Sequence, residues 1–224
     1  MKIFLINRKG LKFSLPFLLI VFSAFACSRS NSVENMKDNN QGPNNQYISQ
    51  INNLPKEPLN DAEKSALLFM REEEKLARDV YFALGEKHGA NIFQNIYSSE
   101  QSHMDALLVL INKYSLSDPV GTNPRGVFQN SDLQKLYDQL IVKGSVSLLE
   151  AFTVGATIED VDIYDLQQTA KNVDNADINF VFNNLINGSQ NHMRAFYRNI
   201  LGAGGTYSAQ YITQTELDAI LNGK

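Results

Sequence analysis

Residues 91–114 read NIFQNIYSSEQSHMDALLVLINKY. Large side chains recur in this stretch in alternating steps of three and four, at Phe93, Ile96, Glu100, His103, Leu107, Leu110 and Tyr114. This spacing places them on one face of an α-helix. The face is apolar except at its middle, where Glu100 and His103 stand one turn apart. We therefore predict a long amphipathic helix whose buried face carries a carboxylate and an imidazole.

Three further segments repeat this pattern and predict long helices at residues 61–86, 145–171 and 175–201. Their apolar faces are also interrupted near the middle, by Glu74, Glu159 and His192 respectively. A shorter helix is predicted for residues 131–143, and the capping box Thr213–Glu216 predicts a last short helix. No segment shows the alternation that is typical of a β-strand.

Four long amphipathic helices bury their apolar faces most simply against one another. We therefore predict an all-α fold, an antiparallel four-helix bundle with a short extra helix in the crossover region and a short C-terminal helix. The folded domain would span residues 61–224.

The first 26 residues have the pattern of a secretory signal peptide. Basic side chains within residues 1–12 precede a short apolar run at residues 13–25, and small residues precede Cys27. The residues before Cys27 resemble the lipobox of bacterial lipoproteins. We expect Cys27 to carry a lipid that anchors the exported protein to the membrane of the bacterial cell envelope. The alternative is an ordinary secretory signal with an incidental cysteine.

Residues 27–60 are predicted to be a flexible tether between this anchor and the domain. The segment is rich in Asn and poor in apolar side chains. Such a composition buries too little apolar surface to offset the entropy lost on folding.

The composition excludes several classes of protein. The chain has 24 Asp and Glu against 20 Lys and Arg, a net charge of −4, which argues against a nucleic-acid partner. Its single cysteine excludes a disulfide framework and a cysteine-rich zinc or iron–sulfur site. Its three histidines are enough for one site made of carboxylates and histidines.

Carboxylates within a helical core need a partner. A buried carboxylate costs several kcal/mol unless it is paired or coordinated, and several facing one another cannot all stay ionised without a cation. No Lys or Arg lies on the four interrupted faces. A divalent metal ion would neutralise them, and Glu100 and His103 have the spacing that di-metal bundles use.

Each of these residues taken alone has a simpler explanation. Glu74 belongs to the acidic run Glu72–Glu74, and such runs are commonly solvated. His192 could be a core histidine with a backbone partner, and Glu159 could pair with a lysine. Their coincidence on four separate faces favours a metal site.

Longer motifs resemble a known family. Residues 72–81 (EEEKLARDVY), 99–104 (SEQSHM) and 188–196 (GSQNHMRAF) are similar to motifs of an uncharacterised bacterial ferritin-like family, a domain of unknown function related to rubrerythrin-type proteins. The resemblance covers residues 63–201. It implies a ferritin-like bundle with Glu100 as bridging ligand and with four other ligands, Glu74, His103, Glu159 and His192.

Two positions depart from the pattern that this resemblance implies. Ala156 stands where rubrerythrins can place an additional glutamate, and Ser189 stands where a second E-x-x-H motif would have its glutamate. Three glutamates and two neutral histidines leave one positive charge over two divalent ions. A bridging hydroxide, a bound anion or Asp162, one turn beyond Glu159, could balance it. Alternatively, the site holds a single ion.

The leading hypothesis is an exported, lipid-anchored protein that binds one or two ions of iron or manganese, with Asp162 as a candidate additional ligand. If redox-active, it would react with O2 or peroxide, or it would handle metal. The alternative is a metal-free interaction module of the cell envelope, which the missing glutamate at Ser189 supports. An iron-storage cage fits the membrane tether poorly. The redox partner and the oligomeric state stay open, with a homodimer as one option.

Overall fold

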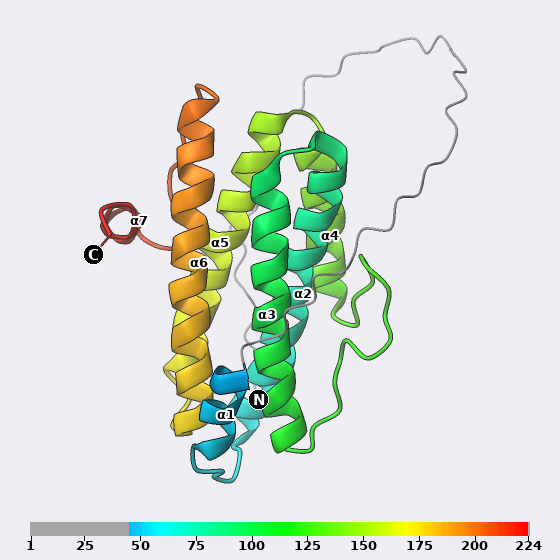
Figure 1. The fold of residues 1–224 in the computed structure, drawn as a ribbon, viewed down its shortest axis with the longest axis vertical. Coiled ribbons are helices and arrows are strands. Elements are labelled where there is room, and N and C mark those ends of the chain that lie inside the picture. Colours follow the sequence, from blue (N-terminus) through cyan, green and yellow to red (C-terminus); the bar gives the residue numbers. More distant parts are fainter. Residues whose placement is uncertain (1–44, 224) are drawn as a thin grey trace. The chain divides into compact units, whose positions relative to one another are not determined.

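The computed structural model describes residues 45–223 of the chain. These residues form seven α-helices and no β-strand, which confirms the predicted all-α class (Figure 1). The helices are α1 (Asn45–Asn53), α2 (Asp61–His88), α3 (Asn91–Lys113), α4 (Ser131–Gly144), α5 (Leu148–Ala170), α6 (Ala176–Gly202) and α7 (Gln214–Leu221).

Local capping explains where several of these helices begin and end. α2 ends at His88 and is capped by Gly89, whose backbone adopts the left-handed conformation (φ 67°) that favours glycine. α5 begins at Leu148 rather than at the predicted Ser145, because the hydroxyl of Ser147 caps its first turn. α7 begins after Thr213, whose hydroxyl caps the helix as predicted.

The long helices α2, α3, α5 and α6 lie side by side in a helical bundle (Figure 1). α2 packs along α3 and α5 packs along α6, while contacts of α2 with α5 and of α3 with α6 join the two pairs. Buried apolar side chains form two clusters, of which one contains Phe93 and Phe196 and the other contains Leu107 and Phe182. Glu74, Glu100, His103 and His192 lie between these clusters along their helices, whereas Glu159 lies beside Ile158 within the first cluster.

The structure departs from the predicted tether at residues 45–60. Residues 45–53 form α1, and the side chain of Ile51 is fully buried in the second apolar cluster. Lys113 of α3 donates hydrogen bonds to the carbonyl oxygens of Ile51 (3.0 Å) and Leu54 (2.9 Å). Tyr47 and Ile51 stand four residues apart, so this short helix covers one end of the core despite its Asn-rich composition.

The predicted signal peptide, Cys27 and the first part of the tether lie outside the described residues. Within residues 45–223, none of the helices has the combination of length and apolar composition that crossing a membrane requires.

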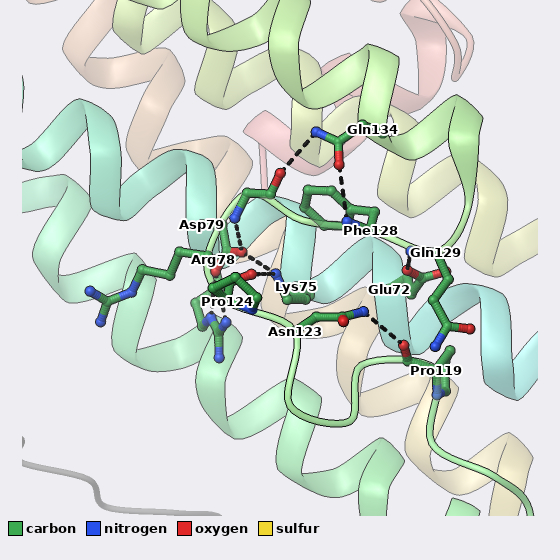
Figure 2. Close-up of polar contacts among 12 residues, drawn as sticks. Glu72, Lys75, Arg78, Asp79, Pro119, Asn123, Pro124, Phe128, Gln129 and Gln134 are labelled. Atoms are coloured by element: carbon green, nitrogen blue, oxygen red, sulfur yellow. Dashed lines mark hydrogen bonds and ion pairs between the residues drawn. The ribbon is translucent and has the colours of Figure 1, made fainter.

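The segment between α3 and α4, residues 114–130, is tied to α2 by buried charged side chains. Lys75 donates a hydrogen bond to the carbonyl oxygen of Pro124 (2.9 Å) and forms an ion pair with Asp79 (2.5 Å) (Figure 2). Glu72 accepts a hydrogen bond from the backbone N–H of Gln129 (2.5 Å). These contacts satisfy charges on α2 that would otherwise be buried alone.

The acidic run Glu72–Glu74 is buried throughout, with no residue more than 4% exposed. Its interpretation as a solvated face is therefore wrong. Successive residues of a helix point about 100° apart, so the three carboxylates diverge. Glu72 faces the loop, Glu73 interacts with Asp165 of α5, and Glu74 faces His103 of α3.

Candidate metal centre

The five predicted ligands meet in one buried layer, although they come from four helices. Their ligand atoms form two groups, in each of which the atoms lie within 4.8 Å of one another. We call Glu74, Glu100 and His103 site A, and Glu100, Glu159 and His192 site B. Glu100 belongs to both groups.

In site A, the imidazole of His103 turns its Nδ1 atom toward two carboxylates. This nitrogen lies 3.1 Å from Oε2 of Glu74 and 2.9 Å from Oε2 of Glu100. Glu100 and His103 are three residues apart on α3, so one helical turn presents both to the same point. The E-x-x-H spacing predicts the carboxylate of Glu100 beside the imidazole of His103, and Glu74 of α2 adds a second oxygen donor.

In site B, His192 of α6 presents its Nδ1 atom in the same way. It lies 2.8 Å from Oε1 of Glu100 and 3.4 Å from Oε2 of Glu159, while its Nε2 atom is 2.9 Å from the hydroxyl of Ser99. The two oxygens of Glu100 therefore face different histidines. The rings of His103 and His192 stack, with centroids 5.5 Å apart.

Several ligand atoms of this layer lack the partner that burial requires. Oε1 of Glu74, Oε1 of Glu100 and Nδ1 of His192 have no hydrogen-bond partner among residues 45–223. The short contact between Glu100 and His192 does not have the geometry of a hydrogen bond. Buried polar atoms are nearly always satisfied, and a cation bound between these atoms would satisfy them. The residues present therefore fit a metal ion.

The pKa shifts of the residues in this layer also fit a bound cation. Burial raises the pKa of the Glu74 carboxyl to about 8, although neighbouring His103 opposes this shift. Burial acts to lower the pKa of His192, but the charges of Glu100 and Glu159 outweigh it and raise the pKa to about 10. These shifts favour the protonated forms of Glu74 and His192 when no cation is bound. Burial acts to lower the pKa of His103 too, but the charges of Glu74 and Glu100 outweigh it and raise this pKa well above its usual range. A divalent ion would replace these protons.

Burial also acts to raise the pKa of Glu100, but the charges of His192 and His103 outweigh it and hold this pKa below its usual range. Glu100 is therefore the carboxylate that stays ionised between the two imidazoles. This charge distribution suits a ligand shared by two cations.

Asp162, the candidate additional ligand, lies beside Ser189, which stands where a second E-x-x-H motif would have its glutamate. Its Oδ2 atom accepts a hydrogen bond from the hydroxyl of Ser189 (2.5 Å), and its Oδ1 atom has no hydrogen-bond partner in the described part of the chain. Burial, followed by the charges of Glu74 and Glu159, raises the pKa of Asp162 well above its usual range. Asp162 belongs to neither site A nor site B. It borders them, close enough for the charges of Glu74 and Glu159 to act on it, and it is hydrogen-bonded to the residue that replaces a glutamate.

Tyr81 fixes the orientation of one ligand. Its hydroxyl donates a hydrogen bond to Oε1 of Glu159, which leaves Oε2 of that carboxylate facing His192. Hydrogen bonds of this kind orient metal ligands in proteins.

Sequence reasoning missed two carboxylates that border the layer, Glu73 and Asp165. Burial and the neighbouring charge of Asp165 raise the pKa of Glu73 well above its usual range. A signal was present for Asp165, which follows Asp162 by three residues and so shares its side of α5. Glu73 carried no such signal, because only the arrangement of α2 against α5 buries it.

The chain resembles proteins known from sequence and from structure. Residues 63–224 match the family described as "Uncharacterized protein domain (DUF2202)". The chain is 49% identical over 175 residues to the uncharacterized protein MJ0754 of Methanocaldococcus jannaschii, an alignment that covers 78% of this chain and 95% of that protein.

A crystal structure of the hypothetical protein MJ0754 from Methanococcus jannaschii is also similar. It superposes with a TM-score of 0.75 over 76% of this chain and 98% of that chain, at 49% sequence identity. The relative is archaeal, and neither its name nor the family description states a function.

Proposed function

The chain belongs to the DUF2202 family of uncharacterised domains, and from this premise we propose that its bundle is a ferritin-like four-helix fold that holds two divalent metal ions. Site A would bind one ion and site B the other, with Glu100 bridging them. The observation that carries this proposal is the position of Glu100, whose two oxygens face two different histidines at 2.9 and 2.8 Å.

Charge balance supports two ions rather than one. Four carboxylates, those of Glu74, Glu100, Glu159 and Asp162, together with two neutral imidazoles neutralise two divalent cations. Ser189 supports this count, because its hydroxyl holds the carboxylate of Asp162 at the position where the E-x-x-H pattern lacks its glutamate. In this proposal Asp162 of α5 would compensate for the glutamate missing at Ser189, the departure that favours the metal-free interaction module.

The donor set favours iron or manganese. It combines carboxylate oxygens with imidazole nitrogens and contains no thiolate, as in the di-iron and di-manganese carboxylate bundles. When bound, either metal would supply redox chemistry with O2 or peroxide at coordination positions that the protein leaves open.

The chain's own residues would orient and shield this site. Tyr81 holds a proton at Oε1 of Glu159 and so directs the other oxygen toward site B. The side chains of His103 and His192 are 11% and 10% exposed, whereas those of Glu74, Glu100 and Glu159 are at most 2% exposed. Small solutes would therefore reach the ions from the side where α3 meets α6.

An anaerobic titration of metal-free protein with Mn(II) or Fe(II) tests this proposal. Equilibrium dialysis should give saturation at two ions per chain. The metal-free interaction module predicts no uptake above that of an equally acidic control protein. Saturation at one ion would contradict the bridged pair and would favour the single-ion alternative.

The same titration tests the role of Asp162. Asp162→Asn removes the fourth carboxylate charge while keeping the side chain's size, so we expect metal affinity about 10- to 100-fold weaker. Asp132→Asn is the matched control, since the Asp132 side chain is 64% exposed on α4, and its affinity should equal that of the wild type. Equal affinities for all three proteins would remove Asp162 from the site.

We also propose that the domain is exported and held at the cell envelope by a lipid on Cys27. The support is the order of basic, apolar and small residues before this cysteine. We expect the wild type to incorporate a labelled fatty acid and the Cys27→Ser variant to incorporate none.

A further inference from the structure

Gly188 of α6 lies directly against the imidazole of His103. A Cβ atom at this position would stand 2.5 Å from Nε2 and 2.7 Å from Cε1 of that ring. Both separations are far below van der Waals contact. The absent side chain thus leaves a notch in α6, and the ring from α3 occupies it.

Backbone freedom does not explain a glycine here. Gly188 lies in the interior of α6, and its φ angle is not in the left-handed region. Glycine in a helix interior costs about 1 kcal/mol relative to alanine. Space for the His103 ring is the structural reason that remains.

We propose that Gly188 is a positioning residue for site A, because its missing side chain allows His103 to present Nδ1 to Glu74 and Glu100. This inference rests on the proposed two-ion function. The ring holds Nδ1 within 3.1 Å of both carboxylates while Nε2 points into the notch. Any shift that frees Nε2 from a new methyl group would therefore move Nδ1 as well, because the imidazole is rigid.

The size of that shift decides its effect. Restoring van der Waals contact requires a movement of about 1 Å. Metal–ligand distances tolerate about 0.2 Å. The stacked ring of His192, 5.5 Å away, restricts movement on one side. Site A would lose its nitrogen ligand, whereas site B, which does not use His103, would keep all its ligands.

Gly188→Ala and Gly202→Ala form a matched pair on the same helix. A Cβ atom at Gly202 meets no atom within 4 Å. Equilibrium dialysis with Mn(II) should give two ions per chain for the wild type and for Gly202→Ala but one ion for Gly188→Ala. Circular dichroism of the metal-free proteins should be the same for all three, which separates lost positioning from lost folding.

A second measurement needs no metal. The chain contains three histidines, so their imidazole ¹⁵N resonances in metal-free protein form a simple spectrum. Gly188→Ala should shift the resonances of His103 and leave those of His88, whose Nε2 contacts Gly144, unchanged. Unshifted His103 resonances, or two ions bound with wild-type affinity, would overturn the role of Gly188. Failure of the wild type to bind metal would instead overturn the two-ion function.

Discussion

Replacing Glu100 with glutamine is expected to reduce the bound metal from two ions per chain to none at micromolar free metal. Glu100 is the residue that sites A and B share, and its two oxygens face His103 and His192 separately. Glutamine keeps the size of the side chain, but it has one carbonyl oxygen and no charge, so it cannot bridge two cations. Elemental analysis after dialysis measures the loss.

Two isosteric variants give this experiment its controls. Glu159→Gln should lose the ion of site B only, because Glu159 takes no part in site A. Glu72→Gln should keep both ions, since Glu72 is equally buried on α2 but faces the loop at Gln129. Two ions in Glu100→Gln would contradict the shared ligand. The same loss in Glu72→Gln would show that removing any buried carboxylate charge from the bundle has this effect.

Removal of metal by a chelator is expected to lower the melting temperature, and to lower it more at pH 8 than at pH 6. A ligand at 1,000 times its Kd stabilises the folded state by about 4 kcal/mol. For a domain of this size, that corresponds to about 10 °C at pH 8. Differential scanning calorimetry with and without EDTA at pH 6, 7 and 8 measures the difference.

The pH dependence follows from the shifts in the metal-free layer. The folded-state pKa of Glu74 is raised from 4.5 to about 8 and that of His192 from 6.5 to about 10. Between each pair of values the folded protein holds a proton that the unfolded chain has lost. Its stability therefore falls as the pH rises through these windows. Glu100, with a lowered pKa, contributes equally across pH 6–8.

Metal affinity changes with pH in the opposite direction to the stability of the metal-free protein. Binding requires ionised carboxylates and neutral imidazoles, so the ions displace protons and their affinity increases with pH. The gap between the melting temperatures of the metal-bound and metal-free proteins should therefore widen from pH 6 to pH 8. A gap that narrows with pH, or melting temperatures that EDTA does not change, would contradict a metal held by these groups.

The helical period alone was enough to predict that the candidate ligands face the core. Glu74, Glu100 and Glu159 interrupt apolar faces, and a face that is otherwise apolar turns inward wherever the helix packs. A polar residue in the middle of such a face is therefore predicted to be in the core without knowledge of its neighbours. The structure places each of these side chains there.

Other features depended on contacts between distant segments. Glu72 is buried because residues 114–130 lie over α2, and local periodicity carries no information about such a cover. α1 is ordered because Ile51 fills one end of the core, which the Asn-rich composition concealed. The notch at Gly188 becomes visible only once α3 and α6 are placed together.

The two-ion centre is tested most directly by an anomalous difference map recorded at the iron and manganese absorption edges. The crystals should be of protein purified without added metal. We predict two peaks about 3.5–4 Å apart on opposite sides of the Glu100 carboxylate, one beside His103 and the other beside His192. A map with no peak in this layer, or with peaks only elsewhere on the protein, would contradict it.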